Sequence, residues 1–402
     1  MLRRAALACC LAVLAACDSG KDDGAASVAN VEWHRADLKA QVERWLALAP
    51  QPSGLMQGEF ERGWQPTRNG TGELTLHSRV VYTMLVGYEA TGDRRYLEAA
   101  RRGADFMLQY FRDPEFGGYF QRVDAAGKPV STGKNTYGHA FALLALAHAG
   151  RVTGEAKYKD AALALWRDVR DKLRHPDGGL RMSAPRDFAA GDSRNSQNHL
   201  MHMFEALLAL IDATGDQSVV GDARELGDFV LLKLMVGLPS GGAYIPEWYD
   251  KHWKPLQDGD GYIDFGHQFE WSHLLRSAER RGLPPIYADV ADRLLKYAVA
   301  TGYDEQEGGV FNRAYPNGQV DRNKYWWPQA EAMRAFLALP GRPDMVRRYH
   351  ETQEFVDQQF LDREHGGWLL GPKKACATGN CSRLQPDPYH LVGLHWTALS
   401  SK

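Results

Sequence analysis

A phrase with two adjacent glycines recurs along the chain and limits the folds that the chain can adopt. The clear copies read FGGYF, DGGLR, SGGAY, EGGVF and HGGWL, and their first glycines are Gly117, Gly178, Gly241, Gly308 and Gly366. A weaker copy surrounds Gly54. A phrase that returns about every 60 residues indicates an array of similar supersecondary units.

Each glycine pair precedes two unlike helical segments. The first is apolar almost all round, as in YGHAFALLALAHA at 137–149, which predicts a helix buried on both sides. The second follows a break such as TGD and is amphipathic, as in RRYLEAARRGADFMLQYF at 94–111. Six such hairpins predict an all-α fold, a closed (α/α)6 barrel, in one domain over residues 34–402. An open solenoid is the alternative, and the lack of clear polar caps at the two ends favours closure.

Equivalent positions near the start of the first helices carry polar residues that an apolar core would not hold. These are Arg79, His139, His202, His267, Gln329 and His390. In a ring of equivalent hairpins, such positions converge on one mouth of the barrel and form a pocket. A single buried histidine is more often a satisfied core residue, but four at equivalent positions favour a binding site. Helix N-termini add N–H groups that suit oxygen-rich ligands.

Aromatic residues accompany these polar positions. They are Tyr82, Phe265, Trp271, Tyr325, Trp326, Trp327 and Tyr389. Aromatic faces beside polar groups match the alternating C–H and O–H surfaces of sugars. Phe265 and Trp271 fit a core role equally well. Trp326 and Trp327 are adjacent and point in different directions, so we expect at least one of them to face the ligand.

Six motifs resemble those of the N-acylglucosamine 2-epimerase superfamily. They are SRVVY, YGHAF, NHLMHMFEA, GHQFEW, KYWWPQAEA and PYH, which occur in the family's order over roughly residues 35–400. The resemblance implies an (α/α)6 barrel that epimerises or isomerises a mono- or disaccharide at C2 without a metal or redox cofactor. The wording GHQFEW is closer to the aldose–ketose isomerases than to the cellobiose epimerases.

The resemblance also implies roles for individual residues. His267 and His390 would form an acid–base pair, Glu270 would orient His267, and Arg79 would stabilise the oxygen of an enediolate. The expected substrate contacts are Tyr82, His139, Asn198, His202, Trp326, Trp327 and Gln329. Glu205 could orient His202 or complete a polar network in the core. An unphosphorylated sugar is expected, because the six positions include only one fixed cation.

Three observations keep other functions open. The family commonly places an arginine one turn after the histidine of PYH, but this chain has Gly393, which is compatible with a sugar-binding protein that has lost catalysis. Carboxylates at Asp264, Glu205, Glu270 and Glu331 would also be available to a glycoside hydrolase or lyase. His267 and Glu270 could form half of a metal site, although the positive charge of Arg79 opposes this.

The N-terminus has the pattern of an exported bacterial lipoprotein. Residues 1–16 begin with basic residues and continue with an apolar run that predicts a signal peptide, and LAAC at 14–17 resembles a lipobox. Cys17 would carry the lipid, and residues 17–33 would form a flexible tether to a periplasmic domain. A simple cleaved signal, with Cys17 incidental, is the alternative.

The remaining composition adds two expectations. Cys376 and Cys381 are the cysteines left after the leader, and a close pair in an exported protein favours a disulfide over free thiols or half a metal site. The formal net charge of −2, without a basic patch, argues against nucleic acid as a partner. We expect a monomer or homodimer that contacts the membrane only through its lipid.

Overall fold

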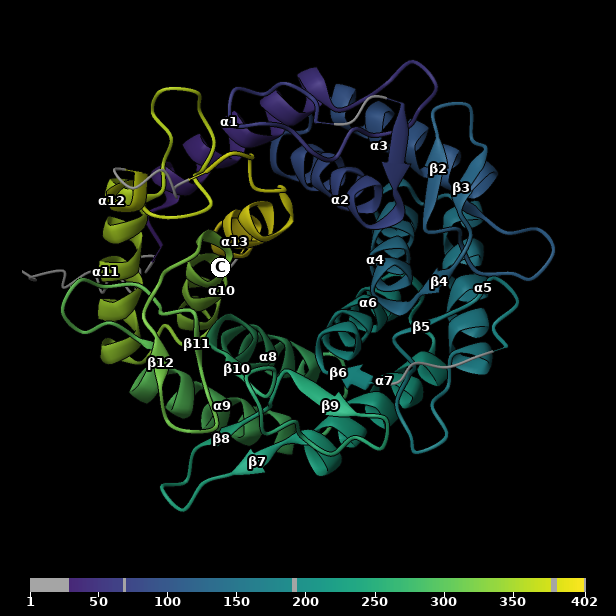
Figure 1. Cartoon of the computed structure of the whole chain (residues 1–402). Helices are drawn as coiled ribbons and strands as arrows, with labels where there is room; N and C mark the ends of the chain where they lie inside the picture. The colour runs from purple at the N-terminus through teal and green to yellow at the C-terminus, as the bar shows by residue number, and fades with distance from the viewer. Residues whose placement is uncertain (1–28, 68–69, 190–193, 377–381, 401–402) are drawn as a thin grey trace, which may run out of the picture.

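Two concentric rings of helices form the body of the protein. The computed structural model describes residues 29–67, 70–189, 194–376 and 382–400. The inner ring contains α2 (Leu74–Thr91), α4 (Thr136–Thr153), α6 (Asn198–Thr214), α8 (Phe265–Glu279), α10 (Trp326–Leu337) and α13 (Tyr389–Ser400) (Figure 1). The outer ring contains α1 (Val31–Leu48), α3 (Arg94–Phe106), α5 (Ala156–Lys172), α7 (Gln217–Phe229), α9 (Ile286–Gly302) and α11 (Pro343–Gln359). The predicted (α/α)6 barrel is confirmed.

The two rings differ in burial as their sequences predict. In α4, every residue from 138 to 150 is buried, because this inner helix packs against its ring neighbours on both sides and against α5 behind it. In α5, burial follows a single stripe that includes Tyr158, Ala162, Leu165 and Val169. That spacing places the stripe on one face, and the other face meets solvent.

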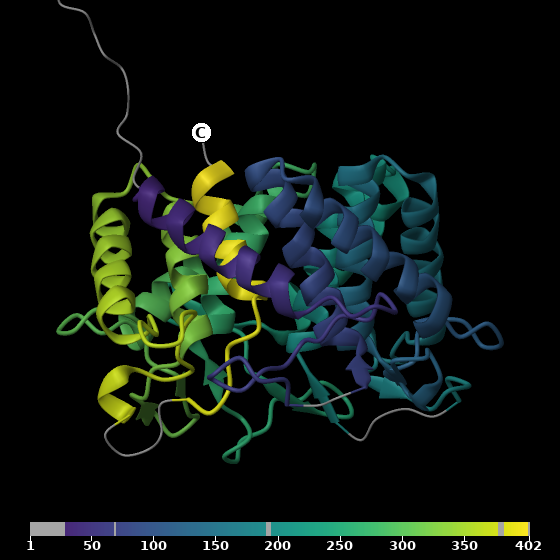
Figure 2. The ribbon, with the colours of Figure 1, turned by 90° about the horizontal axis from the view of Figure 1, so that it is seen from above.

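The sixth pair of helices joins the two ends of the chain. The pairs α2–α3, α4–α5, α6–α7, α8–α9 and α10–α11 are consecutive hairpins, but α13 packs against α1 and also against α2 (Figure 2). The barrel therefore closes, which rules out the open solenoid. Because α1 is part of the ring, the folded domain includes Ala29 and Val31 and begins before residue 34, the predicted boundary.

Short antiparallel strands connect the loops at one end of the barrel (Figure 2). The pairings are β1 (Thr71–Glu73) with β2 (Arg122–Asp124) and β3 (Pro129–Ser131), β4 (Lys134–Asn135) with β5 (Ser183–Ala184), β6 (Arg194–Ser196) with β9 (Trp248–Asp250), β7 (Val236–Gly237) with β8 (Ala243–Tyr244), and β10 (Ile263–Asp264) with β11 (Arg313–Ala314) and β12 (Val320–Asp321). Three further short helices are η1 (Met107–Phe111), η2 (Val230–Leu234) and α12 (Lys373–Cys376). Several of these strands end where an inner helix begins, so this end carries the first turns of the inner helices.

The repeated glycine pair makes a turn that the next inner helix holds in place. Gly117 and Gly118 both have positive φ, at 79° and 61°, and a Cβ on Gly118 would lie 2.8 Å from Nε2 of His139. That nitrogen accepts a hydrogen bond from the Tyr119 amide at 2.9 Å. The turn at Gly309 is built in the same way around the side-chain oxygen of Gln329. At these two copies, the glycine turn is therefore fixed to the inner helix that follows it.

The predicted leader and one predicted cysteine fall outside the described residues. These are the signal peptide at 1–16, Cys17, most of the tether, and Cys381. The lipid anchor and the Cys376–Cys381 disulfide therefore stay predictions. In the part of the chain that the structure describes, no helix is both long enough and apolar enough to cross a bilayer.

Candidate active site

Four of the predicted polar residues meet inside the strand-bearing end of the barrel. Arg79, His202, His267 and His390 come from four inner helices, and each is less than one tenth exposed. The rings of His202 and His390 are 6.5 Å apart, and both lie next to the ring of Tyr389. Equivalent helices therefore do bring distant polar residues to one place.

Trp327 lies between the two histidines that were expected to act as acid and base. Its ring centroid is 4.9 Å from that of His267 and 5.4 Å from that of His390. Trp326 meets His390 edge-on at 5.6 Å and is more deeply buried. The indole of Trp327 thus lies next to both imidazoles.

Glu247, and not Glu270, holds His267. Nδ1 of His267 donates a hydrogen bond to Oε2 of Glu247 at 2.7 Å. The carboxylate of Glu247 also accepts from Ser196 Oγ at 3.0 Å and from Gln197 Nε2 at 2.7 Å. The prediction that Glu270 orients His267 is wrong, because residues three apart on a helix share a face without their side chains having to touch.

The His267 imidazole is held in its charged form. Burial alone would lower its pKa, but the carboxylates of Glu247 and Asp264 outweigh burial and raise the pKa of His267 to about 10. Burial opposes ionisation of Glu247, yet the nearby His267 lowers the pKa of that carboxyl below its usual value. At neutral pH the pair is an imidazolium beside a carboxylate, with Nε2–H of His267 available as an acid.

His390 has a carboxylate of its own but stays neutral. Nδ1 of His390 donates to Oε1 of Glu331 at 2.7 Å, and Nη1 of Arg334 donates to both oxygens of Glu331 at 3.1 and 3.0 Å. Burial and the positive charge of Arg79 hold the pKa of His390 well below 6.5. Its Nε2 therefore keeps a lone pair and can accept a proton. Two histidines with pKa values moved in opposite directions define an acid and a base.

Glu270 is a buried carboxyl without a hydrogen-bond partner among the described residues. It is fully buried, and its Oε1 lies 3.8 Å from Nδ1 of His202. Burial, with Glu331 and Glu205 nearby, raises the pKa of Glu270 well above 4.5 and so favours its protonated form. It can then donate a hydrogen bond into the pocket.

The same carboxyl belongs to two groups with metal-compatible spacing. Ligand atoms of Glu270, Glu331 and His390 lie within 4.8 Å of one another, as do those of His202, Glu205 and Glu270. Arg334 and Arg79 place positive charge beside these groups, which disfavours a further cation. The expectation of no metal and no cofactor stays a prediction.

Arg79 is fixed by residues that were not predicted to contact it. Its Nη1 donates to Asp387 at 2.9 Å and its Nη2 to the Tyr137 hydroxyl at 2.6 Å, while its guanidinium lies 4.1 Å from the Phe141 ring centroid. Asp387 also accepts from the Tyr389 amide near the start of α13. A helix-capping aspartate before PYH was therefore the available signal for this partner.

Two predicted substrate contacts make structural hydrogen bonds. His139 uses both ring nitrogens on the backbone: Nδ1 donates to the Asn135 carbonyl at 2.6 Å, and Nε2 accepts from Tyr119. Gln329 binds the Val310 amide and carbonyl and the Tyr325 carbonyl. Both side chains hold glycine turns. His139 also lines the cavity described below, so its contact with a sugar stays a prediction, whereas Gln329 is not part of that lining. One position on a helix corresponds to a rotation of about 100°, so small errors in repeat alignment select the wrong face.

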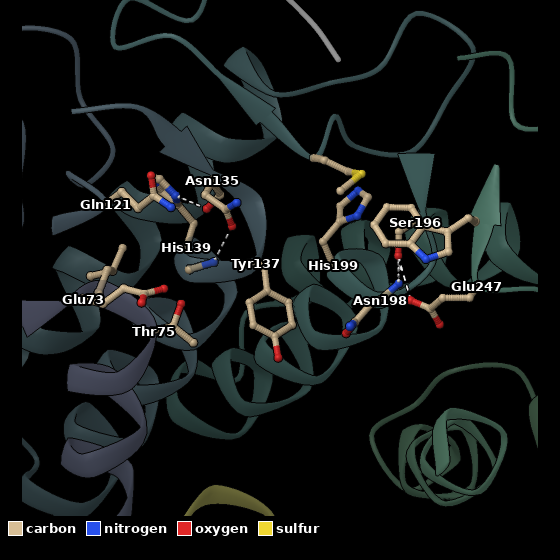
Figure 3. Close-up of a pocket in the computed structure, with 14 residues that line it drawn as sticks. Glu73, Thr75, Gln121, Asn135, Tyr137, His139, Ser196, Asn198, His199 and Glu247 are labelled. Carbon is tan, nitrogen blue, oxygen red and sulfur yellow. Dashed lines mark hydrogen bonds between the residues drawn. The ribbon is translucent and has the colours of Figure 1, made fainter. Parts of the chain in front are cut away.

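A cavity of about 250 Å³ lies beside this site, lined by partners of the site residues and not by His202, His267 or His390 themselves (Figure 3). Its wall includes Tyr137, which binds Arg79, and Glu247, which binds His267. Oδ1 of Asn198 is buried there without a hydrogen-bond partner in the described structure, and the Trp248 ring forms an apolar wall. The role of Asn198 as a sugar contact stays a prediction that this geometry favours.

His202 and Tyr82 lie deeper than Asn198. Nδ1 of His202 pairs with Glu205 at 3.3 Å, and Glu205 also accepts a short hydrogen bond from the Tyr389 hydroxyl. Glu205 therefore has both roles that its sequence allowed. Tyr82 packs against the Tyr389 ring at 5.8 Å. The sugar contacts of His202 and Tyr82 also stay predictions.

Comparison with known proteins shows which family the chain belongs to. Residues 56–393 match the model of the N-acylglucosamine 2-epimerase (GlcNAc 2-epimerase) family. The chain belongs to this family. The N-acylglucosamine 2-epimerase of Bos taurus is 28% identical over 285 residues, which make up 68% of this chain and 66% of that protein. Membership makes the chain an isomerase or epimerase.

Two further relatives cover more of the fold. A D-mannose isomerase of Thermobifida fusca is 31% identical over 315 residues, which are 72% of this chain and 75% of that protein. The structure of a cellobiose 2-epimerase from Bacillus thermoamylovorans B4167 matches with a TM-score of 0.84 at 20% identity, covering 92% of this chain and 99% of that one. At that identity, the structural likeness shows the shared barrel alone.

Proposed function

We propose that this protein epimerises or isomerises an unphosphorylated aldose at C2 by moving a proton through an enediolate. The observation that carries the proposal is the pair of histidines on either side of Trp327, each with its own glutamate and with opposite pKa shifts. Removing the proton next to a sugar carbonyl needs a base at carbon and an acid at oxygen. The pair supplies both.

The reaction proceeds in two proton transfers. Nε2 of His390 accepts the C2 proton, the C–H electrons form the C1–C2 double bond, and the carbonyl electrons move to oxygen. The guanidinium of Arg79 and Nε2–H of His267 stabilise the charge on that oxygen. Delivery of the Nε2 proton of His267 to C2 on the opposite face gives the epimer. Return of the proton held by His390 to C1, with transfer of the C2 hydroxyl proton to O1 through His267, gives the ketose.

The charges around the pocket support an unphosphorylated substrate. Arg79 is paired with Asp387 at 2.9 Å, and Arg334 is paired with Glu331 at 3.0 Å. A phosphate would have to compete with these carboxylates for positive charge. Sugar hydroxyls need only neutral hydrogen-bonding groups such as those of Asn198 and Tyr137.

Solvent isotope exchange tests the proposed chemistry. The protein would be incubated in D2O with mannose, glucose, fructose, N-acetylglucosamine and cellobiose, and each sugar analysed by NMR. An epimerase introduces deuterium at C2, and an aldose–ketose isomerase also does so at C1. The His390→Asn variant should incorporate none. Release of glucose from cellobiose would indicate the hydrolase alternative, and sugar binding without exchange would indicate the non-catalytic one.

We also propose that the enzyme is exported and held at a membrane by a lipid on Cys17. The support is the basic, then apolar, leader that ends in LAAC. An unphosphorylated sugar fits this location, because phosphorylated sugars are chiefly products of cytoplasmic kinases that need ATP.

A further inference from the structure

The site contains the same histidine–glutamate pair twice, with one difference. In the first pair, Glu247 is held by the neutral groups of Ser196 and Gln197, and His267 carries the compensating positive charge. In the second pair, Arg334 binds Glu331 and supplies that charge. Each unit is close to neutral overall. In the first unit the histidine is the positive group, whereas in the second unit the arginine is positive and the histidine is neutral.

Arg334 forms a buried ion pair with Glu331. Arg334 follows Glu331 by three residues on α10, so the two side chains share a face. The Arg334 side chain is 8% exposed, and the Glu331 side chain is fully buried. An ion pair with so little exposure is only weakly screened by solvent, so the charge of Arg334 acts directly on Glu331 and His390.

Gly393 provides the room for this guanidinium. It follows His390 by three residues on α13, and a Cβ at this position would lie 3.3 Å from Nη1 and 3.4 Å from Cζ of Arg334. Any larger side chain would push the guanidinium away from α13. The family commonly has an arginine one turn after the histidine of PYH. Here the guanidinium of Arg334, from the neighbouring helix α10, lies beside Gly393 at that position.

We propose that Arg334 is a positioning residue of the reaction. It balances the negative charge of Glu331, so that Glu331 orients His390 without favouring the protonated form of His390. Gly393 leaves the space that Arg334 needs. The inference rests on the proposed function, in which His390 is the base. Arg334 acts through Glu331 and is not itself assigned a contact with the substrate.

Other charged and titratable groups face this unit, and they are the same in every variant below. They are Arg79 and Tyr82 of α2, His202 and Glu205 of α6, Glu270 and His273 of α8, and Asp387 and Tyr389 at the start of α13. Because these groups stay in place, a change that follows substitution of Arg334 reports the loss of its charge.

The pH dependence of kcat/KM tests the proposal. In Arg334→Met, the unbalanced carboxylate of Glu331 favours the protonated form of His390, so the acidic limb should move to higher pH by at least one pH unit. At a fixed pH on the acidic side, activity then falls about tenfold for every pH unit by which the limb moves. Arg334→Lys keeps the charge and should keep the limb near its wild-type position. An acidic limb that does not move in Arg334→Met overturns the proposal.

NMR titration of the histidine side chains gives a second readout that needs no substrate. His390 should remain neutral to well below pH 6.5 in the wild type and take up its proton at higher pH in Arg334→Met. The His390→Asn variant identifies its signal. If the wild type exchanges no deuterium with any sugar, the proposed function fails, but this titration still decides the role of Arg334.

Two further variants make the result specific. Arg348→Met removes an arginine of the outer helix α11 that is bound to Glu305, and it should leave the pH profile unchanged. Gly393→Ala keeps every charge and displaces the guanidinium slightly, so it should move the acidic limb in the same direction as Arg334→Met but less far. If Arg334→Met does not fold, an unshifted limb in Gly393→Ala overturns the proposal.

Discussion

At the scale of single residues, the state of each histidine depends on the carboxylate behind it. Glu247→Gln would remove the charge that raises the pKa of His267 to about 10. His267 acts as the acid and is active while protonated, so its lower pKa should move the basic limb of the kcat pH profile to lower pH. Activity near neutral pH should fall as well, within the roughly 10²–10⁴-fold that acid–base groups contribute.

Glu270→Gln is the matched control for that change. Burial raises the pKa of Glu270 and favours its neutral form, and Glu270 contributes less to the raised pKa of His267 than Glu247 and Asp264 do. The basic limb should therefore move less than in Glu247→Gln. Equal shifts in the Glu247 and Glu270 variants, measured under the same conditions, would contradict the assignment of Glu247 as the partner of His267.

The histidines were predictable from the sequence, but their partners were not. His202, His267 and His390 stood out because polar residues interrupt apolar helices, and that signal is local. Glu247 was missed because it lies in a loop that the pairing of β6 with β9 brings to His267. Helical periodicity in the sequence cannot relate Glu247, in a loop, to His267, which lies twenty residues later on a helix. The wrong choice of Glu270 followed from reasoning within one helix.

At the scale of elements, the glycine turns and their clamps form the repeated unit. Gly118→Ala would place a Cβ 2.8 Å from Nε2 of His139 and break its hydrogen bond to the Tyr119 amide. A buried amide left without a partner costs about 1–3 kcal/mol. We expect urea unfolding to show a loss of stability of that size beyond the cost of a positive φ.

Gly154→Ala separates these two costs. Gly154 ends α4 with φ of 73°, close to that of Gly118, but has open space where a Cβ would stand. Its substitution carries the backbone cost alone. Similar losses of unfolding free energy in both variants would show that the His139 clamp adds nothing to stability.

The helices were predictable and the strands were not, for one physical reason. An inner helix such as α4 presents many consecutive buried residues, which the sequence displays as an apolar run. The strands are two or three residues long, too short for any alternation to be read. Their pairing depends on where the barrel brings the loops together.

At the scale of the whole molecule, a buried chain of hydrogen bonds closes the ring. Tyr349 of α11 bonds to Nε2 of His34 at 2.6 Å, and Nδ1 of His34 bonds to Nδ1 of His395 at 2.8 Å. Nε2 of His395 then donates to Asp37 at 2.8 Å. The chain joins α11, α1 and α13, and contact between the two Nδ1 atoms requires that at least one imidazole be neutral.

Acid should therefore weaken the closure. Burial, and then the neighbouring His395, lower the pKa of His34 to about 2, whereas an unfolded histidine has a pKa near 6.5. The unfolded chain binds the extra proton as pH falls below 6.5, so this stability is present above pH 6.5 and is lost towards pH 2. Between pH 7 and pH 5 the loss from His34 alone should be about 2 kcal/mol.

The His34→Gln variant isolates this contribution. Glutamine does not titrate, so the variant should lose less stability than the wild type over the same pH range, although it starts from a lower value at pH 7. Urea unfolding midpoints of both proteins at the two pH values give the comparison. An equal loss in both would assign the acid sensitivity to other buried histidines.

The anchor is also a property of the whole chain. If Cys17 carries a lipid, Cys17→Ser should move the protein from the membrane fraction to the soluble periplasm, or leave an unprocessed precursor. Fractionation of cells that express each form, with immunoblotting, measures this. A mature protein that still requires detergent for extraction after the substitution would exclude the lipidation of Cys17.

Because α1 pairs with α13, the first and last helices of the domain must come together before the barrel is complete. The outer helix that is made first packs mainly against the inner helix that is made last, and less extensively against α2. The ring therefore cannot close until the whole domain has been synthesised. Loss of α13 would remove the main helix partner of α1 and open the inner ring between α10 and α2.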